Sequence, residues 1–273
     1  MHRPRLRTPR AFRRARRVVV ALAIVGVVLL LIGHISVGGS LLGGMLLCLG
    51  LLESSQLRQL IIEGHRQQYA LTQIRPLIGD LPLDLSGWAA DPVLVHNAVR
   101  LVIDTRPSFV VECGSGSSTI AIARTLRACG GRLVSLEHDA KYAQRTREML
   151  RLHGLDDLAM VVTAPITSCD VAGQTFQWYT PAYEPLLSQP IEMLVVDGPP
   201  GSIGPRSRYP AVPILKPHLA EQCWILMDDG ARRYERDVAR TWSQDLGAKL
   251  TYLEGGRGAW LLQCTGVSPR SSP

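Results

Sequence analysis

The sequence predicts an α/β fold built on a largely parallel sheet, preceded by an apolar N-terminal segment. Short continuous apolar runs alternate with helical patterns from about residue 93 onward, and the last two apolar runs flank a glycine-rich turn. Residues 18–52 contain no charged side chain. Continuous apolar strands that alternate with helices are typical of a parallel sheet covered on both faces. The 273 residues have room for one such domain and an appendage.

The positive charge of the chain is concentrated at its N-terminus. The net charge is +7, yet residues 1–17 carry eight arginines and no acid, which leaves 22 basic against 23 acidic residues afterwards. Sequence-independent binding to nucleic acid needs clustered positive charge on the folded surface, so we expect none by this domain. The six cysteines lack the paired spacing of a zinc or disulfide framework. We therefore expect reduced, packed thiols.

Residues 18–53 predict a transmembrane helical hairpin. One helix over this run would be about 50 Å long, against a hydrocarbon core of about 30 Å. The glycines at 38 and 39 suggest a break, which gives helices over about 18–35 and 40–53. The length of the run argues against a cleaved signal peptide, and the residues flanking the arginine pairs match a twin-arginine export signal poorly.

The arginine-rich segment 1–17 predicts the orientation of this hairpin. Arginines ahead of the first span favour a cytoplasmic N-terminus, so residues 1–17 are expected to be a basic cytoplasmic tail. A hairpin returns the chain to the same side, whereas a single pass would place the domain outside, away from cytosolic cofactors. The expected location is the cell inner membrane with a cytoplasmic catalytic domain.

Beyond the hairpin, the pattern predicts a linker helix, the domain and a disordered tail. The linker is expected over residues 54–81, and its helix is expected to end near Pro76. Alternatively, its apolar positions belong to a helix that binds a partner. The domain covers residues 82–265 and the tail 266–273. In order along the domain, we expect a helix at 93–104, a strand at 108–112, a helix at 119–128, a strand at 132–137, a helix at 140–153, strands at 158–163, 191–196 and 224–227, and a hairpin of 249–253 with 259–263.

A glycine-rich loop follows the first strand, in the run VECGSGSST. Gly114 and Gly116 allow a tight turn, and Ser117 or Ser118 can cap the next helix, whose amides favour a carboxylate or phosphate. The second strand ends at Glu137, where an acid can bind two ribose hydroxyls. A dinucleotide loop would have a third glycine where this chain has Thr119. The loop therefore suits the aminoacyl end of S-adenosylmethionine (SAM) better than a pyrophosphate.

These stretches resemble class I SAM-dependent methyltransferases, particularly bacterial ones with a "VDGPPG…RYPA" block after the fourth strand. The resemblance covers about residues 82–264. The matching stretches are GWAA at 87–90, the loop at 112–118, LEHD at 136–139, API at 164–166, WY at 178–179, VDGPPG at 196–201, RYPA at 208–211 and DD at 228–229. It implies SAM as cofactor and a Rossmann-like seven-stranded methyltransferase sheet that closes with a terminal antiparallel hairpin.

The resemblance also implies which residues bind the cofactor. The loop would lie along SAM, Glu137 would hold the ribose, and Ala164 and Pro165 would border the adenine. Many relatives place an acid beside the adenine amino group, but here Asp170 lies several residues too late. The full predicted cofactor-binding set is Glu112, Gly114, Ser115, Gly116, Ser117, Ser118, Glu137, His138, Ala164 and Pro165.

Three aspartates follow the fourth and fifth strands. In catechol-type O-methyltransferases, which this part is similar to, an Asp and an Asp-Asn pair at these positions bind Mg²⁺, and Asp197, Asp228 and Asp229 are therefore candidate metal ligands. This chain has Asp229 in place of Asn, and no lysine base follows Asp197. The alternative is that the acids cap helices or pair with arginines such as Arg208. Without a metal, Asp197 is the predicted catalytic residue, either orienting SAM or accepting the substrate proton.

The predicted function is methyl transfer from SAM to an oxygen of a small-molecule or lipid-linked substrate at a membrane. Methyl transfer depends mainly on positioning, which agrees with the lack of a nucleophile–base set in the sequence. Arg206 and Arg208, on the loop after the fourth strand, either recognise an anionic substrate or are simply solvated. An NAD-dependent oxidoreductase and a non-catalytic membrane scaffold remain the alternatives. The oligomeric state is not predicted.

Overall fold

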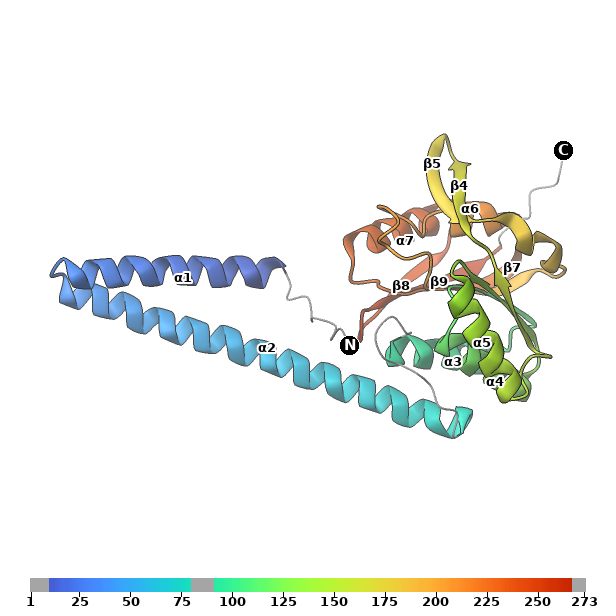
Figure 1. Ribbon diagram of the computed structural model, residues 1–273, viewed down its shortest axis with the longest axis horizontal. Helices are drawn as coiled ribbons and strands as arrows, with labels where there is room; N and C mark the ends of the chain where they lie inside the picture. The colour runs from blue at the N-terminus through green and yellow to red at the C-terminus, as the bar shows by residue number, and fades with distance from the viewer. Residues whose placement is uncertain (1–9, 80–90, 267–273) are drawn as a thin grey trace. The chain divides into compact units, whose positions relative to one another are not determined.

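The computed structural model describes residues 10–79 and 91–266 (Figure 1). The chain divides into two compact units, Met1–His65 and Arg66–Pro273. Each unit is described by itself below, because their relative placement is not determined.

The first unit holds α1 (Arg10–Leu31) and the part of α2 (Ile35–Ile78) up to His65, joined by a short turn. Gly33 has a φ of +92°, a left-handed value that favours glycine, and the amide of His34 donates to the carbonyl of Leu29. The helix break therefore lies at residues 32–34 and not at 37–40. The glycines at 38 and 39 stay inside α2, where they cost propensity but do not end the helix.

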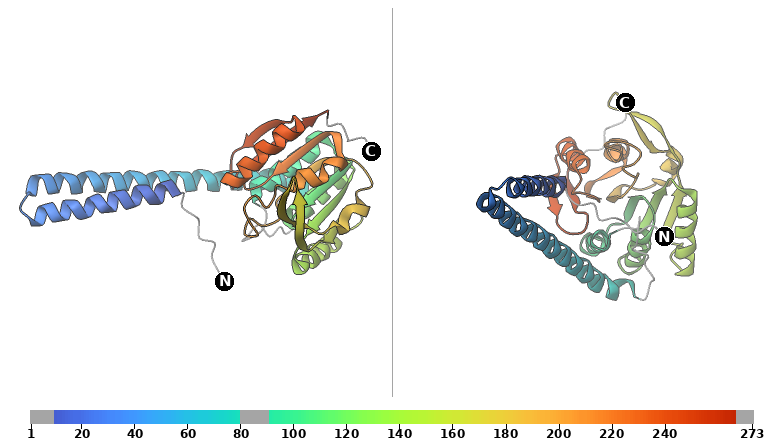
Figure 2. Two further views of the ribbon diagram at one scale, coloured as in Figure 1. Left: turned by 90° about the horizontal axis from the view of Figure 1, so that it is seen from above. Right: turned by 60° about the vertical axis from the view of Figure 1, so that its left-hand side comes forward.

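Helix α2 continues without interruption over residues 54–78 of the segment predicted as a separate linker. Among the described residues, one helical stretch, Gly39–Pro76, is long and apolar enough to cross a membrane, judged by length and composition alone. The two helices run side by side over the first half of α2 in both Figure 1 and Figure 2. Many large apolar side chains of α1 and of the first half of α2 are exposed, among them Val18, Ile24, Leu31, Leu46 and Leu51. Apolar surface of this extent is typical of a membrane-facing or partner-facing element.

The second unit contains the α/β sheet domain that the sequence predicts. Its sheet has seven strands in the order β3-β2-β1-β6-β7-β9-β8, and β9 runs antiparallel to both its neighbours. The predicted terminal hairpin is thereby confirmed. The elements are α3 (Pro92–Thr105), β1 (Phe109–Cys113), α4 (Ser117–Cys129), β2 (Arg132–Glu137), α5 (Ala140–Leu152), β3 (Ala159–Thr163), β4 (Ile166–Val171), β5 (Gln174–Tyr179), η1 (Pro181–Leu186), β6 (Ile191–Val196), α6 (Ala211–Leu215), η2 (Lys216–His218), β7 (Leu219–Met227), α7 (Arg233–Leu246), β8 (Lys249–Leu253) and β9 (Ala259–Thr265).

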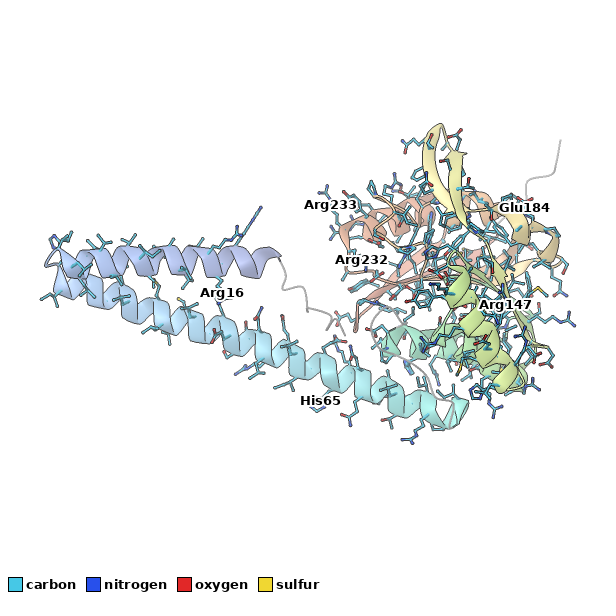
Figure 3. All side chains as sticks on the ribbon, viewed as in Figure 1. Arg16, His65, Arg147, Glu184, Arg232 and Arg233 are labelled. Carbon is cyan, nitrogen blue, oxygen red and sulfur yellow. The ribbon has the colours of Figure 1, made fainter. Side chains whose placement is uncertain are left out.

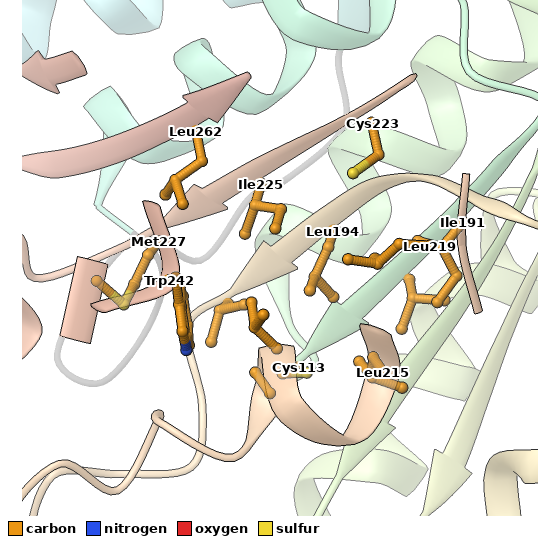
Figure 4. Packing of buried hydrophobic residues seen from close by; sticks show 14 of the residues in the cluster. Cys113, Ile191, Leu194, Leu215, Leu219, Cys223, Ile225, Met227, Trp242 and Leu262 are labelled. Atoms are coloured by element: carbon orange, nitrogen blue, oxygen red, sulfur yellow. The ribbon is translucent and has the colours of Figure 1, made fainter. Parts of the chain in front are cut away.

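Helices cover both faces of the sheet, so the central strands are apolar on both sides. Helices α3, α4 and α5 lie on one face and α6 and α7 on the other (Figure 1). Figure 4 shows the core on the second face, where Trp242 of α7 packs with Met227 and Leu262. On β1, Val111 belongs to this core and Val110 to the opposite one. This explains why the strands read as continuous apolar runs in the sequence.

The last turns of α2 belong to the domain. Ile74 and Ile78 are buried in the core beside α3 and α4, and Arg66 forms an exposed ion pair of 3.2 Å with Glu254 in the β8–β9 turn. The residues predicted as a linker therefore contribute to the domain core at their C-terminal end. The stretch GWAA at 87–90 lies outside the described residues.

A β-hairpin that the sequence analysis did not predict lies between β3 and β6. Strands β4 and β5 form a separate two-stranded antiparallel sheet. Their turn is Ala172-Gly173, with φ values of +51° and +74°, the sign that two-residue hairpin turns require. The sequence feature that could have predicted this hairpin is Gly173, which lies between two short runs of strand-forming residues. The hairpin brings Trp178 and Tyr179 into the core beside the carboxyl end of β1.

Candidate active site

The glycine-rich loop begins where β1 ends and touches the end of β6. Gly114 has a φ of +97°, and a side chain there would place its Cβ 3.1 Å from the amide nitrogen of Gly198. The amides of Asp197 and Gly198 both donate to the carbonyl of Cys113, at 2.9 and 2.6 Å. The left-handed φ and this tight contact both favour glycine here. The loop and the "VDGPPG" turn thus form one connected edge of the sheet.

Gly116 lies immediately before α4, and its amide donates to Thr119 Oγ1 at 2.9 Å. Thr119 therefore closes the first turn of the helix, the role predicted for Ser117 or Ser118. A Cβ on Gly116 would meet nothing within 4 Å, so the space in front of this glycine is open. An N-terminal helix end beside open space is a suitable place for the carboxylate of a ligand.

Glu112 lies beneath the loop. Its side chain is fully buried, and Oε2 accepts hydrogen bonds from Thr119 Oγ1 at 2.5 Å and from Ser135 Oγ at 2.7 Å. Burial raises the pKa of Glu112 to about 7, against the lowering effect of hydrogen bonds from Ser118, Thr119 and Ser135. In this position Glu112 braces the loop against β2 and does not face the open space.

Glu137 at the end of β2 is joined directly to the loop. Its Oε2 accepts from the amide of Ser115 at 2.9 Å and from Ser115 Oγ at 3.1 Å. Its Oε1 accepts from the amide of Asp139 at 3.0 Å and lies 2.9 Å from His138 Nδ1. Burial acts to raise the pKa of Glu137, but the bonds from His138, Asp139 and Ser115 outweigh it and leave the pKa lowered. The same contact raises the pKa of His138.

The segment after β3 lies beside the backbone of Glu137. The amide of Ala164 donates to the Glu137 carbonyl at 2.7 Å, and Thr180 donates to the carbonyl of Pro165 at 2.9 Å. These contacts bring three predicted cofactor contacts, Glu137, Ala164 and Pro165, to one edge. Asp170 instead lies on β4, where its carboxylate accepts from Thr175 Oγ1 across the hairpin. Arg147 of α5, labelled in Figure 3, donates to the carbonyl of Val161 and secures β3.

The three predicted aspartates also meet. Asp197 follows β6 and Asp228 and Asp229 follow β7, and one carboxylate oxygen of each lies within 4.8 Å of the other two. Asp228 and Asp229 are buried, and the side chain of Asp197 is 18% exposed. Burial, followed by the charge of Asp228, raises the pKa of Asp197 well above its usual value despite the nearby arginines.

Arginines fill the space around these acids. Arg208, with a side chain only 3% exposed, contacts Asp197 Oδ1 at 3.2 Å and Asp229 Oδ2 at 2.7 Å. Its guanidinium also donates to the main-chain carbonyls of Asp197 and Asp228, each at 2.6 Å. The alternative that the acids pair with Arg208 is therefore confirmed, and the expectation that Arg208 is a solvated surface residue is wrong. Arg206 stacks on the ring of Tyr209 at 4.4 Å.

Arg257 is a member of this site that the sequence analysis did not identify. It lies in the β8–β9 turn and contacts Asp228 Oδ2 at 3.0 Å and Asp229 Oδ1 at 3.5 Å. Nothing in the sequence around Arg257 predicts its contact with the aspartates, because that contact depends on β9 lying beside β7. Arg232, labelled in Figure 3, adds a 2.8 Å contact to Asp229 Oδ2.

The donor set does not fit Mg²⁺ as it stands. Mg²⁺ requires oxygen ligands at about 2.0–2.1 Å in near-octahedral array. Here guanidinium groups already lie within hydrogen-bond or ion-pair distance of oxygens from all three aspartates. The geometry instead favours a charge-compensated cluster of acids and arginines.

Comparisons with known proteins agree with this geometry. Residues 111–230 match the family model described as "Methyltransferase domain". Over 107 residues, the chain is 34% identical to the "Transmembrane O-methyltransferase" of both human and chimpanzee, an alignment covering 35% of this chain. The chain spans only about a third of the length of these curated relatives, 36%.

Solved structures show the same fold. A SAH-bound methyltransferase from Podospora anserina matches with a TM-score of 0.51 and 15% identity, over 78% of this chain and 96% of that one. The human methyltransferase 10 domain containing protein matches with a TM-score of 0.50 and 15% identity, over 74% and 96%. The predicted Rossmann-like methyltransferase sheet is thereby confirmed.

Proposed function

We propose that this protein is a membrane-anchored, SAM-dependent methyltransferase that methylates an oxygen of a small-molecule or lipid-linked substrate. One observation carries the proposal: the glycine-rich loop and Glu137 lie at adjacent strand ends and are joined by two hydrogen bonds from Ser115. The match to a methyltransferase-domain model and the sheet order support it.

The residues of this edge fit SAM. The open space at Gly116 and the amides that begin α4 would receive the aminoacyl carboxylate. Glu137, whose lowered pKa keeps it ionised at neutral pH, would accept from the ribose hydroxyls. Ala164 and Pro165 would border the adenine. When bound, SAM supplies an electrophilic methyl group on a sulfonium centre.

Asp197 is the group of this chain best placed to handle a proton. It lies at the end of β6, beside the loop edge, and burial together with the charge of Asp228 raises its pKa, so this carboxylate binds a proton more readily than an ordinary aspartate. In the proposed reaction, Asp197 would take the proton that the acceptor oxygen loses as its bond to the methyl carbon forms, while the bond between that carbon and the sulfonium sulfur breaks and SAH leaves. Arg208 fixes the orientation of the Asp197 carboxylate.

The membrane part of the proposal rests on the exposed apolar surface of α1 and α2. Residues 35–52 of α2 would rise about 27 Å, close to the thickness of a hydrocarbon core. The arginines of residues 1–17, which precede the apolar part of α1, favour a cytoplasmic N-terminus, and the turn at Gly33 reverses the chain. We infer an inner-membrane location with the domain in the cytoplasm, where SAM is made.

The cofactor proposal is tested by calorimetric titration of the full chain in detergent with SAH and, separately, with NAD⁺. We expect saturable binding of SAH and none of NAD⁺. Glu137→Ala should weaken SAH binding about 10- to 100-fold, since charge-assisted hydrogen bonds are lost.

Glu192→Ala is the matched control. Glu192 also accepts from a backbone amide and a hydroxyl, those of Ser108, but at the opposite end of β1. It should leave SAH affinity unchanged. Binding of NAD⁺ in place of SAH would favour the oxidoreductase alternative. SAH affinity that is insensitive to Glu137→Ala would remove that residue from the site. A non-catalytic scaffold would bind SAH but transfer no methyl group to any acceptor.

A further inference from the structure

The cluster of Asp197, Asp228 and Asp229 has the oxygen spacing of a cation site but is already neutralised from within the chain. Their oxygens lie within 4.8 Å of one another at the ends of β6 and β7. Three carboxylates this close repel one another and need positive charge among them. Nearby arginine side chains supply that charge.

Arg208 lies between the two strand ends. Its Nη2 is 2.7 Å from Asp229 Oδ2, 3.2 Å from Asp197 Oδ1 and 2.6 Å from the Asp197 carbonyl, while Nη1 donates to the Asp228 carbonyl at 2.6 Å. One nitrogen thus contacts a carboxylate from each strand end. A metal ion shared by Asp197 and Asp229 would have to approach the same oxygens against the charge of this buried guanidinium.

Arg257 and Arg232 compensate the remaining charge. Arg257 Nη2 is 3.0 Å from Asp228 Oδ2, and Arg232 Nη1 is 2.8 Å from Asp229 Oδ2. The three arginines come from separate segments, namely the loop before α6, the β8–β9 turn and the segment before α7. They stay within reach of the acids only while the sheet is folded.

We propose that Arg208, assisted by Arg257, takes the place of a divalent cation at these three aspartates, so that the protein binds no divalent cation there and its substrate is positioned without one. Removing the charge of Arg208 uncovers a latent cation site. The inference concerns charge compensation and does not require that the proposed methyl transfer be correct.

The test is Mn²⁺ binding by the untagged full chain in detergent, followed by the electron paramagnetic resonance signal of free Mn²⁺. The wild-type protein should show no site at sub-millimolar concentration. Arg208→Gln should gain one site, at least ten times tighter than any wild-type binding, because the carboxylates lose their internal counter-charge. Arg208→Lys keeps the charge and should gain none.

Two further variants locate the gained site. Arg208→Gln with Asp228→Asn should lose it, and Arg206→Gln, which removes a neighbouring arginine stacked on Tyr209, should not create it. A wild-type Mn²⁺ site that is lost in Asp228→Asn would overturn the proposal, as would a folded Arg208→Gln protein that gains nothing. If Arg208→Gln fails to fold, the wild-type and Asp228→Asn measurements decide. SAH titration of the same samples keeps failure of this inference distinct from failure of the proposed function.

Discussion

At the scale of single residues, the two glutamates of the site have opposite roles because their surroundings differ. Glu137 accepts four hydrogen bonds at the edge of the sheet and its pKa is lowered. Glu112 is fully buried beneath the loop and its pKa is raised to about 7. Ionised Glu137 is therefore suited to accept hydrogen bonds from a ligand. Glu112, by contrast, makes the stability of the folded loop depend on pH.

Glu112 should make the stability of the domain depend on pH. Its pKa is raised from 4.5 to about 7 on folding, so its stabilising contribution is present below about pH 4.5 and is lost as the pH rises through about 7. Relative to Glu112→Gln, which cannot ionise, the wild-type free energy of unfolding should fall by on the order of 3 kcal/mol between pH 4.5 and 8. Urea unfolding followed by tryptophan fluorescence measures this difference, and a constant difference across that range would contradict it.

The sequence predicts the positions of the site residues better than their contacts. Spacing and strand ends placed Glu137, Ala164, Asp197 and the aspartate pair together, because the carboxyl ends of parallel strands meet at one edge. Spacing could not reveal that Thr119 caps α4 or that Arg208 is buried. Both depend on which side chains fill the space between neighbouring elements.

At the scale of elements, the strands and helices of the parallel sheet follow from apolar patterning, whereas the β4–β5 hairpin does not. Five parallel strands and the terminal hairpin have continuous apolar runs bounded by polar turns. Strand β4 (ITSCDV) is largely exposed and pairs only with β5, so it lacks such a run. Strand β7 also begins earlier than the predicted residue 224. The apolar pattern missed its first residues because they include the exposed Glu221 and Gln222.

The α4–β2 connection should be intolerant of a side chain at Gly131. Its φ is +103°, and a Cβ there would lie 2.3 Å from the carbonyl oxygen of Pro107. Gly131→Ala should destabilise the domain by about 3 kcal/mol, combining backbone strain with a steric clash. Gly154 is the matched control: its φ is +60°, but a Cβ would meet nothing within 4 Å, so Gly154→Ala should cost about 1 kcal/mol. Equal losses in urea unfolding would argue against the clash.

At the scale of the whole molecule, the turn at Gly33 decides on which side of a membrane the domain would lie. Two spans return the chain to the side on which it began, and one span does not. The arginines of residues 1–17, which precede the apolar part of α1, favour the cytoplasm for that side. We expect a C-terminal green fluorescent protein fusion to fluoresce in a bacterial host and the corresponding alkaline phosphatase fusion to be inactive.

A truncated fusion provides the control. Alkaline phosphatase joined directly after His34, in the turn between α1 and α2, should be exported and active. An active phosphatase at the C-terminus of the full chain would indicate a single span and place the domain outside. That result would contradict the inferred orientation while leaving the fold and the site geometry as they are.

The saturated carboxylate of Glu137 has a consequence for how any ribose-bearing ligand is received. Because four donors already surround this group, a diol arrives by exchange and not by simple addition. The amides of Ser115 and Asp139 are fixed in the backbone, so Ser115 Oγ and His138 are the donors free to rotate away. The observed affinity would then be the difference between the hydrogen bonds that Glu137 makes to the ligand and those it gives up to Ser115 Oγ and His138.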